Sequence, residues 1–356
     1  MTRHHLLPIV LLAACAREPQ LPPTEYVASP AADTLVAAVV GLSEAVRRSD
    51  GSYVLLAPLE SAVLVADFAA KTVGPHPGIT REEVPGASVL LAAGDTAIVG
   101  DWGLRRMTSW LADGTRTDAV PIPDAARGAL PRARDAAGQW YFAIGPNPGR
   151  DGSGNTDSTA IVRADAMLAR FDTVARLSPP DLGPMQADGQ SRMQIRALSG
   201  RDAWGVLRDG TLWIARVNQN QLEWHPVAGE RYRTRPLPDP ILTVTEMDRQ
   251  IWLRRFPEEQ RGMARSTPFA LVKPPFERAF AEPDGRIWLF KSAPALDSVR
   301  TFQVADSGGV KFLVKVPSRG EALAVGDGYI LMGEEFPEGV RLLRYAIPPE
   351  ARRSVE

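Results

Sequence analysis

The amino-acid sequence predicts an all-β fold, a six-bladed β-propeller closed by its N-terminal strand. Three observations lead to this fold class: one turn sequence recurs in front of apolar strands, the copies are spaced by about forty residues, and almost no segment has helical periodicity. Spacing in this range is typical of propeller blades. The chain has 356 residues, but repeat-built folds run longer than other domains, so we expect a single folded domain.

The repeated turn is aspartate, or alanine in one copy, followed by glycine, with bulky apolar residues behind it. Asp-Gly favours the positive φ angles of a type I′ turn, and β-branched or aromatic residues favour strands, so each copy predicts a β-hairpin. We expect the aromatic residues at equivalent places in the copies to pack between blades. The copies are Asp50-Gly51-Ser52-Tyr53-Val54-Leu55, Ala137-Gly138-Gln139-Trp140-Tyr141-Phe142, Asp209-Gly210-Thr211-Leu212-Trp213-Ile214, Asp284-Gly285-Arg286-Ile287-Trp288-Leu289-Phe290 and Asp327-Gly328-Tyr329-Ile330-Leu331.

Six blade-like units can be drawn around these turns. The last unit shows only about three strands, whereas the β-prone segment Thr34–Val40 near the start has no hairpin partner. We expect this segment to supply the missing strand, so that the ring closes without a free edge. The units cover Glu44–Phe68, Ala87–Ile122, Leu130–Leu177, Ala203–Pro226, Arg278–Val316 and Glu321–Ile347.

One segment between the fourth and fifth units has helical character. Thr245 is followed three residues later by Asp248, as at a helix N-terminus, and apolar residues including Trp252 recur at helical spacing. We expect a helix from Glu246 to about Arg261. The competing interpretation makes Ile251-Trp252-Leu253 a strand of a seventh blade, but no Asp-Gly turn precedes it.

The first residues have the pattern of an export signal. A short basic start is followed by the apolar run Leu6–Leu12, which is too brief to cross a bilayer, and then by Leu12-Ala13-Ala14-Cys15. This ending resembles the bacterial lipoprotein signal, in which the cysteine is acylated and the residues before it are removed. The resemblance implies lipid attachment at Cys15, the only cysteine in the chain; the alternative is an ordinary cleaved signal. By the same resemblance, Ala16 implies sorting to the outer membrane.

These features divide the chain into four parts. We expect a signal peptide at 1–14, the lipidated cysteine and a proline-rich flexible tether at 15–33, the propeller at 34–348 with its helical insertion at about 246–261, and a C-terminal tail at 349–356. No later apolar run is long enough to cross a membrane, so we expect membrane contact through the lipid alone. The formal net charge of −1 does not favour nucleic-acid binding.

The repeats resemble six-bladed propellers of the NHL-repeat type and the related TolB-like exported propellers. In that repeat, an aspartate at a bend precedes an arginine and a strand that ends in a second Asp-Gly turn. The best match is Asp101, then Arg105 or Arg106, then Trp110-Leu111-Ala112-Asp113-Gly114, although no copy is complete. The resemblance implies the fold rather than a reaction, because this architecture hosts binding modules, lactonases, lyases and cyclotransferases.

The loop after the bend is our candidate binding site. Trp102 lies beside Arg105 and Arg106, and an aromatic ring with two cations can contact an anionic or aromatic partner. Asp101 belongs to the same candidate site. The alternative is an ordinary exposed turn in which Asp101 accepts hydrogen bonds from nearby backbone amides.

We identify no catalytic constellation and expect no metal or other cofactor. His76 and His225 lie outside the signal, but neither is near a nucleophile motif. A calcium ion in the channel, with Glu44 and Asp101 among its ligands, would fit the lactonase-type alternative. The loop 151–157 has too few acidic residues for a calcium loop.

The sequence therefore predicts a lipid-anchored envelope protein that faces the periplasm and acts as a monomeric, non-catalytic binding or scaffold module. Its partner would be an envelope protein, a peptide or a glycan, contacted by loops at one mouth of the channel. The first alternative is a metal-dependent propeller hydrolase of the lactonase type. The second is an assembly-factor lipoprotein like the larger propeller of the outer-membrane protein insertion machinery, whose blade count differs from six.

Overall fold

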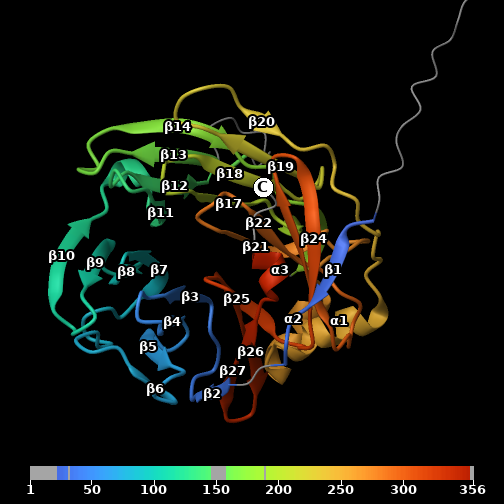
Figure 1. Cartoon of the computed structure of the whole chain (residues 1–356). Coiled ribbons are helices and arrows are strands. Elements are labelled where there is room, and N and C mark those ends of the chain that lie inside the picture. The colour runs from blue at the N-terminus through green and yellow to red at the C-terminus, as the bar shows by residue number, and fades with distance from the viewer. Residues whose placement is uncertain (1–21, 31–32, 146–157, 188–189, 353–356) are drawn as a thin grey trace, which may run out of the picture.

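The computed structural model describes residues 22–30, 33–145, 158–187 and 190–352, and it confirms the predicted six-bladed β-propeller. Six mainly antiparallel sheets lie around a common centre (Figure 1). Blades 1 to 3 consist of β3 (Glu44–Arg47), β4 (Tyr53–Ala57), β5 (Ala62–Asp67) and β6 (Thr72–Pro75); β7 (Ala87–Ala93), β8 (Thr96–Asp101), β9 (Arg106–Trp110) and β10 (Arg116–Pro121); and β11 (Pro131–Arg134), β12 (Trp140–Ile144), β13 (Ala160–Ala164) and β14 (Phe171–Arg176).

Blades 4 to 6 follow the same order, in which each strand pairs with the next. They consist of β17 (Ala203–Val206), β18 (Leu212–Arg216), β19 (Gln221–His225) and β20 (Tyr232–Arg233); β21 (Phe276–Ala281), β22 (Ile287–Lys291), β23 (Arg300–Asp306) and β24 (Gly309–Val316); and β25 (Glu321–Gly326), β26 (Tyr329–Phe336) and β27 (Gly339–Ala346). A short 3₁₀ helix, Asp124–Ala126, joins blades 2 and 3.

The first strand of every blade contacts the first strands of both neighbouring blades. The strands β3, β7, β11, β17, β21 and β25 therefore form a closed inner ring. Because strand direction alternates within a blade, all six inner strands begin on one face of the ring and end on the other. Connections between blades, and the loops between second and third strands, lie on the first face.

The ring is closed by the N-terminal strand, as the sequence predicts. Strand β2 (Asp33–Ala37) pairs antiparallel with β27 and completes blade 6. Leu35 and Ala37 are buried in the core that blades 6 and 1 share. The Asp33 carboxylate lies 2.5 Å from the Arg344 guanidinium, which fixes the first residue of the strand.

A further strand lies where the composition predicts a flexible tether. Strand β1 (Thr24–Val27) pairs in parallel with β24 and gives blade 5 a fifth strand. The Tyr26 ring packs edge-on against Phe312 at 5.5 Å, and the Glu25 carboxylate lies 2.5 Å from the Lys315 amine. Adjacent side chains, Glu25 and Tyr26, thus attach this segment to the blade. The sequence does not predict this strand, because the flanking prolines are typical of an extended tether.

The hairpin turns differ from the expected type I′. Only Asp327-Gly328 has positive φ at both residues (50° and 81°). At Asp50-Gly51 and Asp209-Gly210 the glycine alone has positive φ, and the aspartate carboxylate accepts a hydrogen bond from the amide two residues on, at 2.8 Å and 2.9 Å. These are type I turns followed by a left-handed glycine, so aspartate is present for its side chain and not for its φ.

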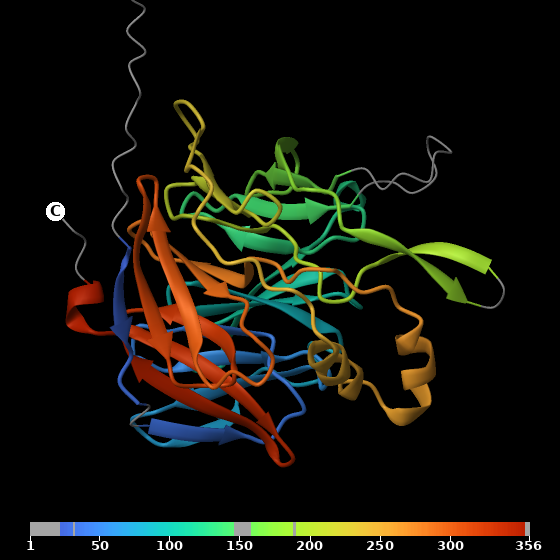
Figure 2. The same ribbon diagram turned by 90° about the vertical axis from the view of Figure 1, so that its right-hand side faces the viewer.

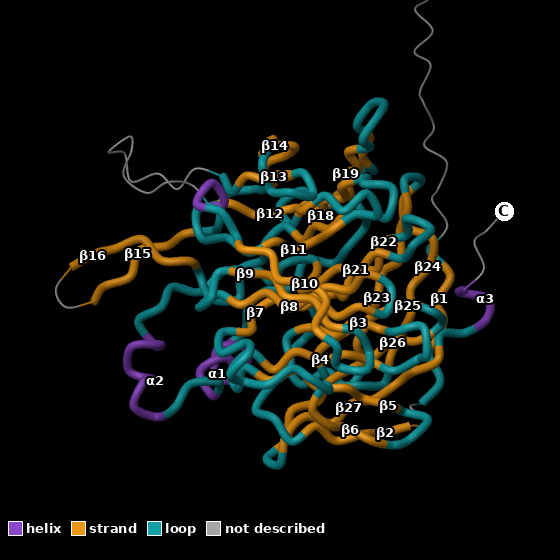
Figure 3. The backbone as a smooth tube through the Cα atoms, turned by 90° about the vertical axis from the view of Figure 1, so that its left-hand side faces the viewer, coloured by secondary structure: helices purple, strands orange, loops and turns teal. Residues whose placement is uncertain are grey.

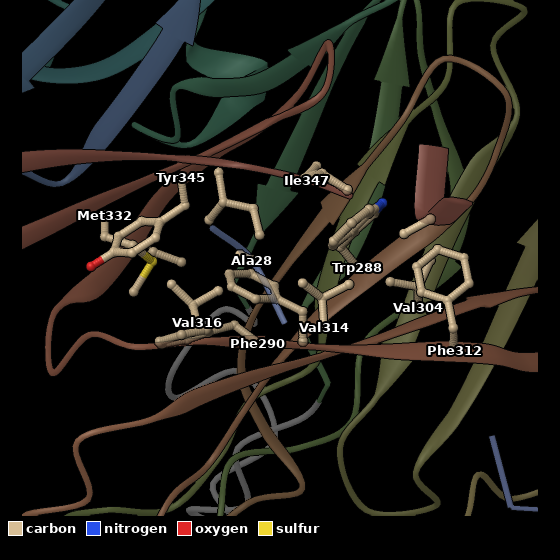
Figure 4. Close-up of a cluster of buried hydrophobic side chains, with 14 residues drawn as sticks. Ala28, Trp288, Phe290, Val304, Phe312, Val314, Val316, Met332, Tyr345 and Ile347 are labelled. Atoms are coloured by element: carbon tan, nitrogen blue, oxygen red, sulfur yellow. The ribbon is translucent and has the colours of Figure 1, made fainter. Parts of the chain in front are cut away.

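The repeat aromatics pack inside and between blades, in agreement with the sequence-based expectation. Tyr53, Trp140, Trp213 and Trp288 are buried. Trp288 lies in a cluster that joins blades 5 and 6 (Figure 4), and its Nε1 donates to the Glu282 carboxylate at 2.9 Å. In the remaining copy, Tyr329 is only half-buried and is covered by arginine side chains.

Two insertions interrupt the regular order. Between blades 3 and 4 stands a hairpin of β15 (Leu182–Ala187) and β16 (Gln190–Ile195), which the sequence pattern does not predict. Between blades 4 and 5 lie α1 (Glu246–Arg254) and α2 (Glu258–Arg265), where we expected a single helix. Pro257 between them is compatible with a helix start but not with a helix interior, which explains the break.

Both insertions project from the same side of the ring, opposite the short C-terminal helix α3 (Pro349–Arg352) (Figures 2 and 3). We call the side that carries them, where the inner strands begin, the insertion face. Within the described residues, no helix is both long and apolar enough to cross a bilayer.

Candidate functional site

The mouth of the channel on the insertion face is braced by Arg278 of β21. Its guanidinium donates one hydrogen bond to the Ala322 carbonyl at the start of β25 and another to the Ser43 carbonyl just before β3. One side chain thus joins the inner strands of blades 5, 6 and 1. The bonds are charge-assisted, and bonds of this kind are stronger than neutral ones.

Glu44 of β3 lies at the same mouth. One carboxylate oxygen accepts from the Leu90 amide at 2.7 Å, and the other lies 3.2 Å from the Arg132 guanidinium. Burial raises the pKa of Glu44, whereas the Leu90 amide, Arg132 and Arg278 act in the opposite direction. The carboxylate therefore links blades 1, 2 and 3.

A second charged group lies where blades 5 and 6 meet. The Glu277 carboxylate lies 2.6 Å from the Arg300 guanidinium. The Glu321 carboxylate lies 3.8 Å from the guanidinium of Arg255, the residue that follows α1. Burial raises the pKa of Glu277; Arg300 opposes this effect and the negative charge of Glu321 adds to it. Each of the three carboxylates Glu44, Glu277 and Glu321 lies near an arginine, so their charges are neutralised locally.

The helical insertion is fixed to the ring by buried polar contacts. Thr245 and Asp248 form the predicted capping box at the start of α1. Asp248 also lies 2.5 Å from the Lys273 amine, which donates to the Ala293 carbonyl in blade 5 at 2.6 Å. Lys273 and its hydrogen bond to Asp248 lower the pKa of Asp248 against the effect of burial. The insertion is therefore held in a definite position over blades 5 and 6.

The base of the hairpin packs on the helical insertion. The Ala197 amide donates to the Pro268 carbonyl at 2.7 Å, and the Ala270 amide donates to the Ala197 carbonyl at 3.0 Å. Phe269 in the same stretch packs edge-on against Trp252 of α1 at 5.1 Å. The two insertions therefore form one composite structure on the insertion face.

Large apolar side chains are exposed mainly on this face. Trp102 is 70% exposed, and Leu271 and Ile241 are 80% and 82% exposed. In the described part of the chain, only three such residues lie in loops of the opposite face: Leu111, Met167 and Val227. The exposed apolar residues of the insertion face are Val40, Leu59, Trp102, Leu104, Met193, Ile241, Met247, Met263, Leu271, Val272, Leu296 and Val299.

The structure separates the roles of the candidate residues in the loop after β8. Asp101 is fully buried, and its carboxylate accepts from the Gly86 amide at 2.9 Å and the Leu104 amide at 2.7 Å. Asp101 therefore holds the bend, and the exposed Trp102 projects from it on the insertion face. Arg105 pairs with Asp124 at 3.0 Å, while Arg106 donates to the Glu83 carbonyl at 3.0 Å. These contacts direct both cations toward neighbouring protein groups.

The remaining sequence-based predictions concern lipid attachment and metal binding. Cys15 and the loop 151–157 lie outside the described residues. Among those that are described, no group of three or more His, Cys, Asp or Glu side chains could hold a metal ion. Both carboxylate oxygens of Glu44 and of Asp101 already accept hydrogen bonds from protein groups.

Comparison with known proteins gives similarity in shape only. No protein-family model and no curated protein matches the chain. A member of the DUF4221 family from Bacteroides vulgatus is 7% identical over 92% of this chain and 97% of its own (TM-score 0.49). A gluconolactonase from Xanthomonas campestris is 12% identical over 92% and 99% (TM-score 0.47), and a virginiamycin B lyase from Staphylococcus aureus is 10% identical over 88% and 98% (TM-score 0.49). Likenesses at such low identity assign no activity to this chain.

The sequence predicted that Trp102 lies in an exposed bend, but it did not predict the composite insertion structure. Its exposed residues are scattered between positions 193 and 272, and only the fold brings them to one face. One signal was available. The segment between blades 4 and 5 is much longer than the other connections, and it contains apolar residues such as Leu271 among prolines.

Proposed function

We propose that this protein is a non-catalytic binding module of the bacterial cell envelope, anchored by a lipid on Cys15, which binds another protein through its insertion face. The observation that carries the proposal is the concentration of exposed apolar side chains on that face, beside two insertions that are fixed to the ring. Exposed apolar patches on soluble domains commonly mark interaction sites.

The kind of side chain favours a protein partner over a glycan. The exposed residues of the insertion are aliphatic or methionine, such as Ile241, Met263 and Leu271, and these groups offer neither a flat aromatic platform nor hydrogen bonds to sugars. Charged side chains surround them, including exposed Arg254 and Glu258. An apolar centre with a polar rim is the usual anatomy of a protein interface.

The position of the N-terminal strand suits this arrangement. Strand β1 runs parallel to β24, the outer strand that leads toward the insertion face, so Thr24 lies toward the opposite face. About nine residues separate Cys15 from Thr24, and an extended chain of that length reaches about 30 Å. A lipid on Cys15 would keep the opposite face near the membrane and leave the insertion face free.

Paired variants test the proposal. One carries Ile241→Asp and Leu271→Asp on the insertion face; the matched control carries Met167→Asp and Val227→Asp on the opposite face. Both add two charges at exposed apolar positions, so we expect little change in the free energy of unfolding of either. We expect a protein of the envelope extract to be retained by the wild type and the control, and lost with the insertion-face variant.

Two results would contradict the proposal. If both variants retain the same proteins as the wild type, the insertion face does not bind them. If the wild type dimerises in solution and the insertion-face variant is monomeric, the face is a contact between two copies of this chain. A Cys15→Ala variant tests the anchor separately, because we expect it to move from the membrane fraction to the soluble fraction.

A further inference from the structure

A cavity of about 670 Å³ opens between blades 3 and 4, apart from the insertion face. Its walls come from β14 on one side and from β18, β19 and β20 on the other. A second cavity of about 240 Å³ adjoins it and shares Thr173, Val174, His225 and Arg231 with it. The combined space is in the range that small-molecule sites occupy.

The cavity is lined by an excess of positive charge. Arg216 is held by two carboxylates, since its guanidinium lies 2.8 Å from Asp202 and 2.8 Å from Glu223. Arg231 and Arg233 differ, because neither has a carboxylate within ion-pair distance in the part of the chain that the structure describes. Arg231 donates to the Val174 carbonyl at 3.3 Å, which directs its guanidinium along the cavity wall. Among the described residues, these two cations of the cavity wall have no acidic partner.

His225 lies where the two cavities meet, and 11% of its side chain is exposed. Its Nε2 is 3.5 Å from the Glu223 carboxylate, whereas its buried Nδ1 has no hydrogen-bond partner among the described residues. A buried polar atom left without a partner is costly, and a bound ligand would satisfy it. Burial lowers the pKa of His225, Glu223 acts in the opposite direction, and Arg231 and Arg216 add to the lowering.

The strand pairing decides which side chains face the cavity. Tyr232 pairs with Trp224, and its ring stacks on Trp224 with 5.3 Å between centroids and 13° between planes. Trp224 lies in the core that blades 4 and 5 share, so both rings lie on the face of blade 4 that points away from the cavity. Because side chains alternate along a strand, Glu223 and His225 lie on the cavity side, where Arg231 and Arg233 also line the wall.

We propose that this cavity binds a small organic anion through a carboxylate or phosphate group. Arg231 and Arg233 hold the oxyanion, which receives charge-assisted hydrogen bonds from them. His225 Nδ1 contacts a second polar atom of the ligand. The site lies between outer strands, so it is independent of the proposed partner face.

Calorimetric titration with citrate and, separately, with inorganic phosphate tests the site and distinguishes carboxylate from phosphate. We expect saturable 1:1 binding of at least one of them to the wild-type protein. The double variant Arg231→Gln, Arg233→Gln should bind about tenfold more weakly or worse, since even one lost charged contact of about 1.4 kcal/mol has this effect. Arg116→Gln, on the outer strand of blade 2, is the matched control and should bind like the wild type.

Titration with sulfate, whose charge is constant near neutral pH, tests His225. An anion favours the protonated imidazole, so the affinity should rise as pH falls, and His225→Gln should remove this dependence. The charged groups facing the imidazole are Glu223, Arg216 and Arg231, with Arg163 and Asp172 in the adjoining cavity. Absence of binding by all three anions at about 10 mM, or equal binding by the double variant and the wild type, would overturn the proposal.

Discussion

Replacing Arg278 by methionine should destabilise the whole ring, because this one side chain joins the inner strands of three blades. Its guanidinium donates to the carbonyls of Ser43 and Ala322. A hydrogen bond to a charged group contributes about 1.5–3 kcal/mol, so two of them amount to about 3–6 kcal/mol. Methionine keeps much of the packing volume, and water can reach part of the mouth, so we expect a loss near the lower end, about 3 kcal/mol.

Urea unfolding followed by tryptophan fluorescence measures this loss. The control is Arg116→Met, which removes an exposed ion pair at 3.1 Å to Glu83 and should cost less than about 1 kcal/mol. The Arg278→Met variant should unfold at a lower urea concentration with an unchanged slope, because the fold and the surface exposed on unfolding are retained. If the two variants lose equal stability, Arg278 does not brace the ring.

Three further predictions concern the fold. Burial lowers the pKa of His76; the Pro77 carbonyl opposes this effect and Arg48 adds to it. The folded protein should therefore lose stability as the pH falls through the pKa of the unfolded state, which is about 6.5. In His76→Gln the urea midpoint should fall less steeply with decreasing pH, and an equally steep fall would show that His76 is not the titrating group. Asp101→Ala should cost about 2–4 kcal/mol in urea unfolding because two amides lose their acceptor, and a loss below about 1 kcal/mol would refute the role of Asp101 at the bend. Removal of residues 1–37, which deletes β2, should abolish cooperative thermal unfolding, whereas removal of residues 1–32 should preserve it; similar melting of both truncations would show that β2 does not close the ring.

The sequence was sufficient for the repeat fold because its signals are local. An aspartate that caps a turn, a left-handed glycine and an apolar strand lie within about eight residues, and each of them acts on the backbone directly. Closure by the segment around Leu35 could be inferred because the last blade lacked a strand. The helix was also predictable from Thr245 and Asp248, since a capping box is a local arrangement.

What the sequence did not reveal depends on distant contacts. The hairpin β15–β16 rests on the helical insertion through Ala197 and Pro268, which lie about seventy residues apart. The attachment of β1 to blade 5 joins Tyr26 to Phe312 across almost the whole chain. Neither contact leaves a periodic pattern, because the segments that make it are short and their partners lie in other blades.

For the candidate site too, the sequence predicted local features and not those that depend on distant contacts. Trp102 was identified as exposed in a bend, and it is, whereas Asp101 has the structural role that the alternative assigned to it. The cavity between blades 3 and 4 brings Arg231 of one blade against Val174 of another, so no stretch of sequence contains it.

Site-specific photocrosslinking in intact cells tests the central claim, binding of another protein through the insertion face, most directly. A photoreactive amino acid is placed at Leu271 on the insertion face or, as the control, at Met167 on the opposite face; both positions are highly exposed, at 80% and 85%. We predict a discrete heavier adduct with another protein from position 271 and none from position 167. Adducts from both positions alike, or from neither, would contradict the proposed binding face.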